Sequence, residues 1–245
     1  MFPYEEPLNL GEFYNLEEPL WVTAAQLRGL MEPYLTEERQ EKIAEVIRGR
    51  TYQVVTVMEG LHDLGNVAAV LRSAEALGFQ EAHVIDTQPK HKVSNRITQG
   101  ADKWLDVHHW RDRLACVEEL KRRGYSICVT HLEESRPVEE VDFTKPTALV
   151  LGNEMDGVTD EMVELADQRC VIPMGGFVES FNISVAAALI LYEAARQRRE
   201  RLGGVGDLTE EQQRVLEALW YVRSVPKGDR LVQELWRRSK SEEVG

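Results

Sequence analysis

The stretch "IPMGGFVESFNISVAAALILYEAARQRRE" (residues 172–200) decides how the second half of the chain is interpreted. An apolar run, two glycines and the polar residues Ser180, Asn182 and Ser184 lead directly into an alanine-rich amphipathic helix. Capping a helix N-terminus needs only one hydroxyl or amide, for which Asn182 and Ser184 are the natural candidates. The remaining polar side chains raise the question of what else lies at the mouth of this helix.

Upstream of this stretch, strand patterns and helix patterns alternate. The β-branched or apolar runs predict strands, and the amphipathic segments between them predict helices. The strands are expected at 53–59, 81–86, 126–132, 147–154 and 169–174, and the helices at 66–79, 114–124, 160–167 and 183–200. Continuous apolar strands separated by helices are typical of a parallel sheet that is covered on both faces. The sequence therefore predicts an α/β core over residues 52–200.

The segments on either side of this core differ from it. Residues 1–20 contain five Glu and neither Lys nor Arg, and their prolines predict an irregular acidic extension. Two short helices are expected after Thr23 and Thr36, and two C-terminal helices on either side of Pro226. The predicted division is residues 1–51, an acidic extension with RNA-contacting helices; 52–200, the α/β domain; and 201–245, a helical extension.

The composition is that of an ordinary globular protein, with 43% hydrophobic and 29% charged residues among 245. No apolar run reaches the roughly 18 residues that a membrane span needs, and the N-terminus lacks the features of a signal peptide. Cys116, Cys128 and Cys170 are widely spaced, which predicts neither a disulfide framework nor a metal site and favours a cytoplasmic location. The net charge of −13 argues against non-specific nucleic-acid binding but does not exclude a locally basic face.

Two common cofactor motifs are absent from the sequence. The first expected strand is followed by "GLHDLGNVAAV", which is not the G-x-G-x-x-G turn of a dinucleotide-binding fold, and there is no G-x-x-x-x-G-K-[ST] sequence. Glycine-bearing turns come late instead, at "LGNEMDGV" and "IPMGGFVESFN". Because ligands of such sheets bind beyond the C-terminal ends of the strands, a cofactor site would be built from the last third of the core.

Three motifs stand at these positions. The first is N-x(5)-R after the first strand, with Asn66 and Arg72; the second is G-x-E-x-x-G after a late strand, with Gly152 and Glu154; the third is the opening stretch. Each has an ordinary interpretation when taken singly: a capping Asn, a solvated Glu in a turn, a glycine turn before a capped helix. The combination of all three, in this order, is much less ordinary.

In this order and spacing the motifs strongly resemble the SpoU/TrmH branch of the SPOUT methyltransferases, over about residues 36–200. The basic helix "TEERQEKIAEVIRGR" is similar to that of family members that methylate the D-loop guanosine at tRNA position 18. The resemblance implies a parallel sheet whose C-terminal part is tied in a trefoil knot, and a homodimer formed through the knot. It also implies S-adenosylmethionine as the cofactor and transfer of its methyl group to a ribose 2′-hydroxyl of tRNA.

The resemblance also assigns roles to residues. Arg72 would bind the phosphate beside the 2′-hydroxyl and polarise that hydroxyl, since a guanidinium with a pKa above about 12 is not a base; the proton acceptor stays open. Asn66, Ser180 and Asn182 would complete the pocket, and Glu154 would hold it in place. The cofactor would be bound, largely by main-chain groups, at His131, Leu132, Gly152, Asn153, Ile172, Met174, Phe181 and Ala186. RNA contacts are expected at Arg39, Lys42, Arg50, Lys103, Arg196 and Arg198.

Three alternatives remain open at this stage. A ribosomal RNA ribose could be the substrate, because the same catalytic residues would serve. A catalytically silent RNA-binding homologue would have no need of Asn66, Arg72, Glu154, Ser180 and Asn182 together. A small-molecule methyltransferase would fit the acidic charge but leaves the basic positions Arg39, Lys42 and Arg50 unexplained.

Overall fold

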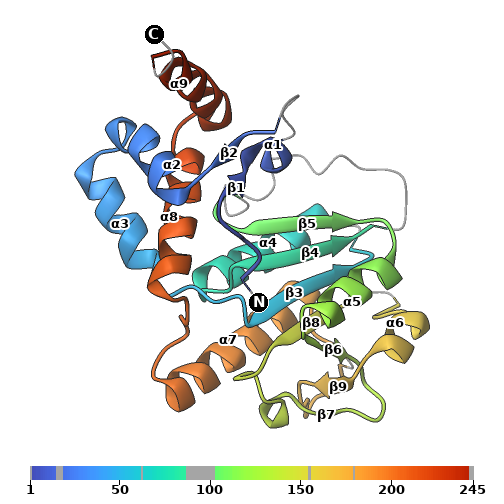
Figure 1. Ribbon diagram of the computed structural model, residues 1–245. Helices are drawn as coiled ribbons and strands as arrows, with labels where there is room; N and C mark the ends of the chain where they lie inside the picture. Colours follow the sequence, from blue (N-terminus) through green and yellow to red (C-terminus); the bar gives the residue numbers. More distant parts are fainter. Residues whose placement is uncertain are drawn as a thin grey trace. The chain divides into compact units, whose positions relative to one another are not determined.

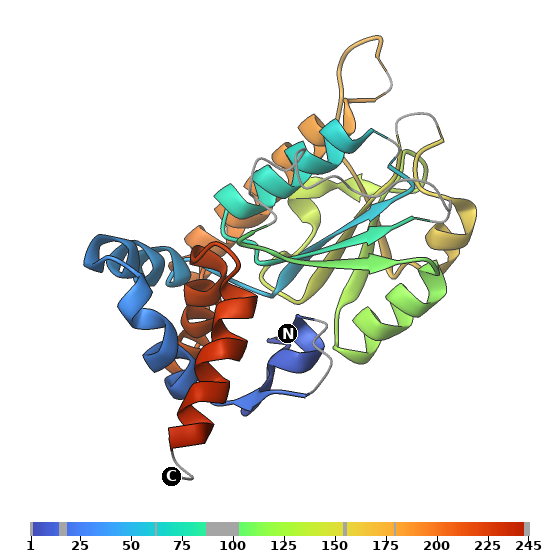
Figure 2. The ribbon, with the colours of Figure 1, turned by 90° about the horizontal axis from the view of Figure 1, so that it is seen from above.

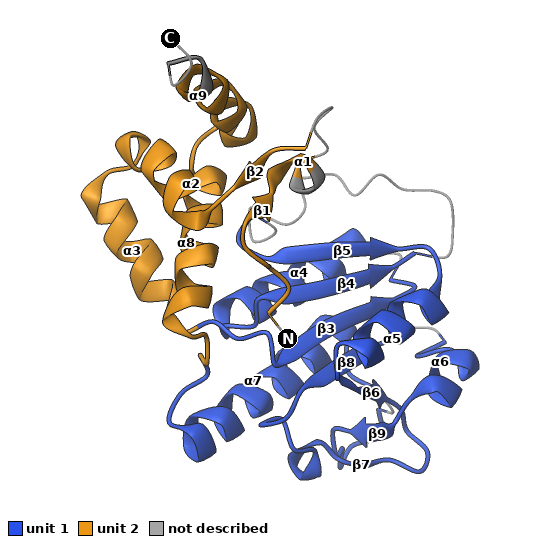
Figure 3. Cartoon of the chain, viewed as in Figure 1, with its two compact units in different colours: residues 1, 50–205 blue, residues 2–49, 206–245 orange. Residues whose placement is uncertain are grey.

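The protein is described by a computed structural model that covers residues 2–14, 19–61, 63–86, 103–153, 156–178 and 180–242. The chain forms two compact units, shown in Figure 3. Residues 50–205 make up the first unit. The segments before and after it, residues 2–49 and 206–245, belong together to the second unit.

The first unit is built on a seven-stranded sheet whose strand pairs are all parallel (Figure 1). The spatial order is β5-β4-β3-β8-β6-β9-β7. The strands are β3 (Val54–Glu59), β4 (Glu81–Ile85), β5 (Asp106–Trp110), β6 (Ser126–Thr130), β7 (Arg136–Pro137), β8 (Thr147–Leu151) and β9 (Gln168–Val171). Strand β8 thus lies between β3 and β6, which places strands from the two halves of the unit side by side at its centre.

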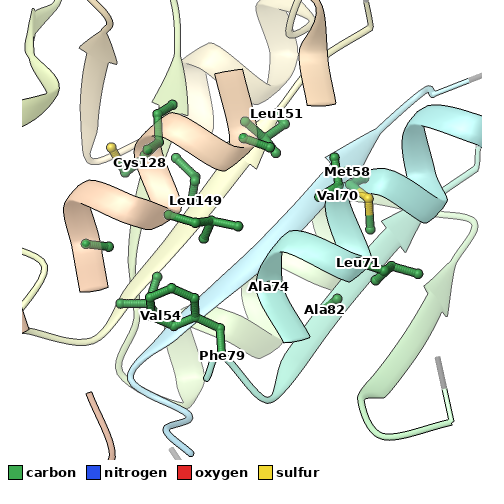
Figure 4. Packing of buried hydrophobic residues seen from close by; sticks show 14 of the residues in the cluster. Val54, Met58, Val70, Leu71, Ala74, Phe79, Ala82, Cys128, Leu149 and Leu151 are labelled. Atoms are coloured by element: carbon green, nitrogen blue, oxygen red, sulfur yellow. The ribbon is translucent and has the colours of Figure 1, made fainter. Parts of the chain in front are cut away.

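Helices cover both faces of this sheet, as Figures 1 and 2 show. Val54 and Met58 of β3 pack in one cluster with α4 (Leu64–Ala76) and α7 (Ile183–Leu202), part of which is drawn in Figure 4. Val55 and Val57 point to the other face, where α5 (Arg113–Arg122) and α6 (Asp160–Leu165) lie. The predicted parallel sheet with helices on both faces is confirmed.

The second unit is mainly helical. Helix α8 (Glu210–Ser224) contacts α2 (Ala24–Met31), α3 (Glu37–Ile47) and α9 (Gly228–Glu242). Thr23, Thr36 and Thr209 cap the N-termini of α2, α3 and α8 through their hydroxyl oxygens, as expected for the first two. Two 3₁₀ turns complete the described elements, η1 (Glu32–Tyr34) in this unit and η2 (Val138–Glu140) in the first. Within the described ranges no helix has the length and apolarity to cross a membrane.

Some predicted elements were wrong or missing. The N-terminal extension is partly regular, because β1 (Leu8–Asn9) pairs with β2 (Trp21–Val22) and α1 (Leu10–Phe13) follows β1. Strands β5 and β7 were not predicted. The sequence of β5, "DVHHW", carries polar side chains because it is an edge strand with two exposed histidines, so it lacks the apolar run of a central strand.

Candidate active site

Three neighbouring strands, β6, β8 and β9, carry most of the predicted cofactor positions at one edge of the sheet. Strands β3, β8, β6 and β9 are adjacent and parallel, so their C-terminal ends meet at the same edge. Gly152 and Asn153 follow β8. Residues 131 and 132 follow β6, and residues 172 and 174 follow β9. The structure therefore brings His131, Leu132, Gly152, Asn153, Ile172 and Met174 to the edge at which α/β sheets bind ligands.

The turn after β8 is closed by its own main chain. The Asn153 N–H donates to the Gly157 carbonyl over 3.1 Å, and the Gly157 N–H donates back to the Asn153 carbonyl over 3.0 Å. The Asp156 N–H donates to Asn153 Oδ1 over 2.8 Å. A Cβ on Gly152 would lie 2.0 Å from the carbonyl carbon of Gly157, so only glycine fits here. Glu154, the acidic residue of this motif, lies outside the described residues.

The N-termini of α4 and α7 meet through two amides. The Asn182 side-chain N–H donates to Asn66 Oδ1 over 3.4 Å, across 116 residues of sequence. The Asn66 side-chain N–H in turn donates to Asp63 Oδ2 over 3.5 Å. Asn182 also caps α7, because its Oδ1 accepts from the Ser184 N–H over 2.9 Å. The first and third motifs are thereby joined, and Asn182 serves both the helix and the site.

The residue that caps α4 is not Asn66, which was considered as a capping residue from the sequence alone. Asp63, rather than Asn66, is the N-cap, and its Oδ1 accepts from the Gly65 N–H over 2.7 Å. A carboxylate only accepts hydrogen bonds, so Asp63 turns the amide hydrogens of Asn66 towards itself and its carbonyl oxygen towards Asn182. Arg72 is exposed on α4, and Ser180 is exposed just before α7, so both side chains lie at the surface on the two joined helices.

Three of the predicted cofactor positions already use their main-chain N–H in the fold. The His131 N–H donates to the Cys170 carbonyl over 3.0 Å, and the Ala186 N–H to the Asn182 carbonyl over 2.9 Å. The Asn153 N–H closes the turn described above. A ligand at these positions is therefore met by carbonyl oxygens, side chains or apolar surface. Phe181, 39% exposed, adds apolar surface next to Asn182.

Four of the six predicted RNA-contacting side chains lie at the surface. Arg39 and Lys42 are exposed on α3, where the Lys42 ammonium pairs with Glu45 over 2.8 Å. Lys103 is exposed, with its ammonium 4.9 Å from the ring centroid of Trp104. Arg196 lies on α7, and its hydrogen bonds with Glu193 raise the pKa of its guanidinium.

The other two basic side chains are buried. Arg198 is 0% exposed and donates to the carbonyls of Val205 and Phe143 over 3.1 and 3.4 Å. Arg50 is 1% exposed and donates to the carbonyl of Glu75 over 3.0 Å, and burial lowers its pKa. Their burial argues against the prediction that Arg50 and Arg198 contact RNA.

The burial of Arg198 could have been predicted from the helical periodicity of α7. The buried positions of the helix recur with helical spacing, and residue 198 falls on the same stripe. These buried positions are Ile183, Ala187, Ile190, Leu191, Ala194, Ala195, Gln197 and Arg198. Counting along this stripe would have separated Arg198 from the exposed arginines Arg196 and Arg199.

A second polar cluster lies at the opposite, N-terminal ends of the strands. Glu81, the first residue of β4, is 0% exposed, and its oxygens accept from the Arg123 guanidinium over 2.5 and 2.6 Å. His83 and His108 lie 3.0 and 3.3 Å from the same carboxylate. Burial alone would raise the pKa of Glu81, but Arg123 and the two histidines hold it well below its usual range.

Comparison with known proteins agrees with this geometry. Residues 53–192 match the SpoU rRNA Methylase family, which is more than half of the chain. The chain belongs to this family. Among individual relatives, the tRNA (guanosine(18)-2′-O)-methyltransferase of Aquifex aeolicus is 36% identical over 201 residues, covering 81% of this chain and 95% of the relative. The enzyme of the same name from Thermus thermophilus is 41% identical over 164 residues, covering 66% and 84%.

Solved structures of the SpoU family share the fold. The crystal structure of the Aquifex aeolicus TrmH/SpoU tRNA modifying enzyme superposes with a TM-score of 0.71 at 36% identity, covering 78% of this chain and 98% of that one. The SpoU methyltransferase AviRb from Streptomyces viridochromogenes, solved in complex with AdoMet, gives a TM-score of 0.54 at 31% identity, covering 64% of each chain. The predicted family membership is thus confirmed.

Proposed function

We propose that the chain transfers the methyl group of S-adenosylmethionine to the ribose 2′-hydroxyl of a guanosine in tRNA, at position 18 of the D-loop. The observation that carries the proposal is the hydrogen bond between Asn66 and Asn182, which joins two distant motifs beside the strand ends that carry the cofactor positions. Relatives that are 36% and 41% identical are named tRNA (guanosine(18)-2′-O)-methyltransferases. A tRNA substrate also fits the cytoplasmic location expected from the sequence.

The strand ends fit the proposed cofactor. Gly152 and the residues after β6 and β9 lie at three adjacent strand ends, and Gly152 packs directly against the backbone of Gly157 with no space for a Cβ. At such a surface the backbone can approach the adenosine of S-adenosylmethionine closely, and carbonyl oxygens can accept hydrogen bonds from it. The family member AviRb has been solved with AdoMet bound. The cofactor supplies a methyl group on a sulfonium, which is a good leaving group.

The residues of this chain then have to orient the 2′-oxygen for attack on the methyl carbon, while the hydroxyl proton leaves to an acceptor other than Arg72 and S-adenosylhomocysteine is the product. Arg72 binds the adjacent phosphate and polarises the 2′-hydroxyl, because a guanidinium is a strong charged donor but not a base. Asn66 and Asn182 hold the ribose through their amides, whose orientation Asp63 fixes. Holding the 2′-oxygen in line with the methyl carbon accounts for a large part of the expected rate enhancement. Ser180 and Glu154 complete the pocket in this proposal.

The proposal includes a trefoil knot and a homodimer. The knot is supported by the strand order, since β8 and β9, late in the sequence, lie on either side of β6. The dimer is supported by an apolar stripe on α7: Val185, Leu189 and Tyr192 are 46%, 43% and 56% exposed at positions i, i+4 and i+7. Sedimentation of the native chain and of Leu189→Glu tests the dimer. A monomeric native chain would contradict it.

Substrate binding is assigned to the exposed basic side chains. Arg39, Lys42, Lys103 and Arg196 remain in the proposal, while the buried Arg50 and Arg198 are left out. The helical unit that contains α3 is proposed to contact tRNA. Its exposed face also bears Glu38, Glu41 and Glu45, which favours specific contacts over general attraction to nucleic acid.

The deciding experiment compares two RNA substrates. Methyl transfer from radiolabelled S-adenosylmethionine is measured on unmodified tRNA and on ribosomal RNA, and the modified nucleotide is mapped. We expect 2′-O-methylguanosine at position 18 of tRNA. Label in ribosomal RNA would favour the second candidate, a ribosomal RNA ribose methyltransferase, which the family's description keeps open. Cofactor binding without transfer to either RNA would indicate a silent RNA-binding homologue or a small-molecule methyltransferase.

A further inference from the structure

A buried carboxylate ends the central strand β3 at the same edge as the proposed site. Glu59 is 3% exposed and lies on the sheet face covered by α5 and α6. It accepts from the Thr159 N–H over 3.0 Å and from the Thr159 hydroxyl over 2.7 Å. Its Oε1 also lies 3.0 Å from Nε of Arg113, the first residue of α5. No role was predicted for Glu59, although it is the only charged residue in the run "VVTVME".

Thr159 stands between the turn after β8 and helix α6. It is the N-cap of α6, and its hydroxyl oxygen accepts from the Met162 N–H over 3.3 Å. Only Val158 separates it from Gly157, which the two main-chain hydrogen bonds tie to Asn153. Whatever holds Thr159 therefore holds the far end of the closed turn.

The residue after Glu59 touches the near end of the same turn. A Cβ on Gly60 would lie 3.8 Å from Asn153 Nδ2. The end of β3 thus lies beside Asn153 through Gly60 and binds Thr159, two residues after Gly157, through Glu59. Two main-chain hydrogen bonds tie Asn153 to Gly157, so a residue that holds Thr159 also restrains Asn153.

We propose that Glu59 is a positioning residue that, through Thr159 and Gly157, fixes Gly152 and Asn153 in the place where they bind the cofactor. The inference rests on the proposed function, because that function assigns Gly152 and Asn153 to S-adenosylmethionine. A carboxylate suits the role because both of its oxygens accept, as the two donors of Thr159 require. An amide in its place would turn hydrogens towards one of these donors.

The alternative is that Glu59 only stabilises the fold, and Glu81 provides the matched control. Glu81 is also a fully buried carboxylate, at the first residue of the neighbouring strand, and is paired with Arg123. Replacing either residue with alanine removes a buried carboxylate from the same sheet. Only Glu59 lies at the edge that carries the turn.

The first test measures S-adenosylmethionine affinity by calorimetry for the native chain, Glu59→Ala, Thr159→Val, Thr159→Ser and Glu81→Ala. We expect Glu59→Ala and Thr159→Val to raise the Kd about tenfold, which is the equivalent of 1.4 kcal/mol. Thr159→Ser keeps both donors and should restore the native Kd, while Glu81→Ala should lower the Tm and leave the Kd within about twofold. Equal changes in Kd for Glu59→Ala and Glu81→Ala would overturn the proposal. If Glu59→Ala fails to fold, Thr159→Val and Thr159→Ser decide.

A second measurement does not depend on the cofactor. Hydrogen exchange of the Asn153 and Gly157 amides reports directly on the turn, because these two groups bond to each other. We expect faster exchange at both amides in Glu59→Ala and Thr159→Val, and native exchange there in Glu81→Ala. Unchanged exchange in the first two variants would contradict the positioning role. A native chain that binds no S-adenosylmethionine would instead refute the proposed function and leave this measurement to decide about Glu59.

Discussion

The two ends of one parallel sheet both collect polar side chains, but they use them differently. At the N-terminal ends, Glu81 is enclosed by Arg123 and two histidines, and the Tyr52 hydroxyl donates to Asp106 over 2.5 Å. At the C-terminal ends, the polar groups of Asn66 and Asn182 meet at the surface beside glycine turns. The first arrangement satisfies its charges internally, whereas the second keeps polar groups within reach of a ligand.

This difference separates stability from function. A buried, paired charge cluster resembles an active site in its residue types, and Glu81 and His83 both have lowered pKa values. Yet the carboxylate is 0% exposed, so no substrate can reach it. The proposed chemistry lies at the end where a capped helix, a joined pair of amides and a closed turn meet. The following predictions test this assignment.

The largest effect is expected for Arg72→Ala. Removing the guanidinium takes away the charge that is proposed to bind the phosphate and polarise the 2′-hydroxyl, so kcat should fall by about 100- to 1,000-fold or more. Because Arg72 does not belong to the proposed cofactor positions, the Kd for S-adenosylmethionine should stay within about twofold. Single-turnover methyl transfer and calorimetry measure the two quantities. Full activity in this variant would refute the role of Arg72.

Gly152→Ala should act at the cofactor instead. The new Cβ would lie 2.0 Å from main-chain atoms of Gly157, so the turn must open, and S-adenosylmethionine affinity should fall about 100-fold. Gly29→Ala is the matched control: an added Cβ on the exposed face of α2 meets no atom within 4 Å, and the helix should gain about 0.5–1 kcal/mol. Native cofactor affinity in Gly152→Ala would show that the turn does not bind the cofactor.

Glu81→Gln should affect stability rather than catalysis. It leaves Arg123 without its carboxylate, and the free energy of unfolding at pH 7 should fall by about 3 kcal/mol. The kcat of the folded protein should not change.

The same cluster predicts a pH dependence. In the folded chain, burial lowers the pKa of His83, and despite burial the pKa of Glu81 is held low by Arg123 and the histidines. The unfolded chain therefore binds more protons, and stability should fall as the pH drops below about 6.5 for His83 and below about 4.3 for Glu81. Urea unfolding from about pH 7 to about pH 3 measures the slope, and Glu81→Gln should lose the part of the slope below about pH 4.3. If the free energy of unfolding of Glu81→Gln depended on acid pH as steeply as that of the native chain, this account would be contradicted.

Local patterns in the sequence singled out residues of the candidate site but not the cluster at the other end of the sheet, for physical reasons. Strands β3 and β8 are continuous apolar runs, and Gly152 and Asn182 stand in local patterns that can be read without a partner. The role of Glu81 depends on Arg123, which is 42 residues away, and on histidines that a parallel register brings opposite each other. No local pattern carries that information.

Two further details were missed for different reasons. Arg196 and Arg198 stand two residues apart in one basic segment, yet only Arg198 faces the interior, where carbonyls of Phe143 and Val205 accept its hydrogens. The acidic extension formed a strand because β2, which follows it in sequence, pairs with it. The strand depends on this tertiary pairing, whereas the burial of Arg198 follows from the apolar stripe of α7.

The smallest effect concerns substrate binding by the helical unit. Arg39→Ala combined with Lys42→Ala should weaken tRNA binding and flatten its dependence on salt concentration by about one unit of slope per lost phosphate contact. Lys42 pairs with Glu45 over 2.8 Å, so Glu45→Gln is the matched control and should strengthen binding by releasing the ammonium. Filter binding across a salt series measures both. An unchanged slope would remove α3 from the RNA face and leave the proposed RNA contacts of the sheet unit, Lys103 and Arg196, to bind the substrate.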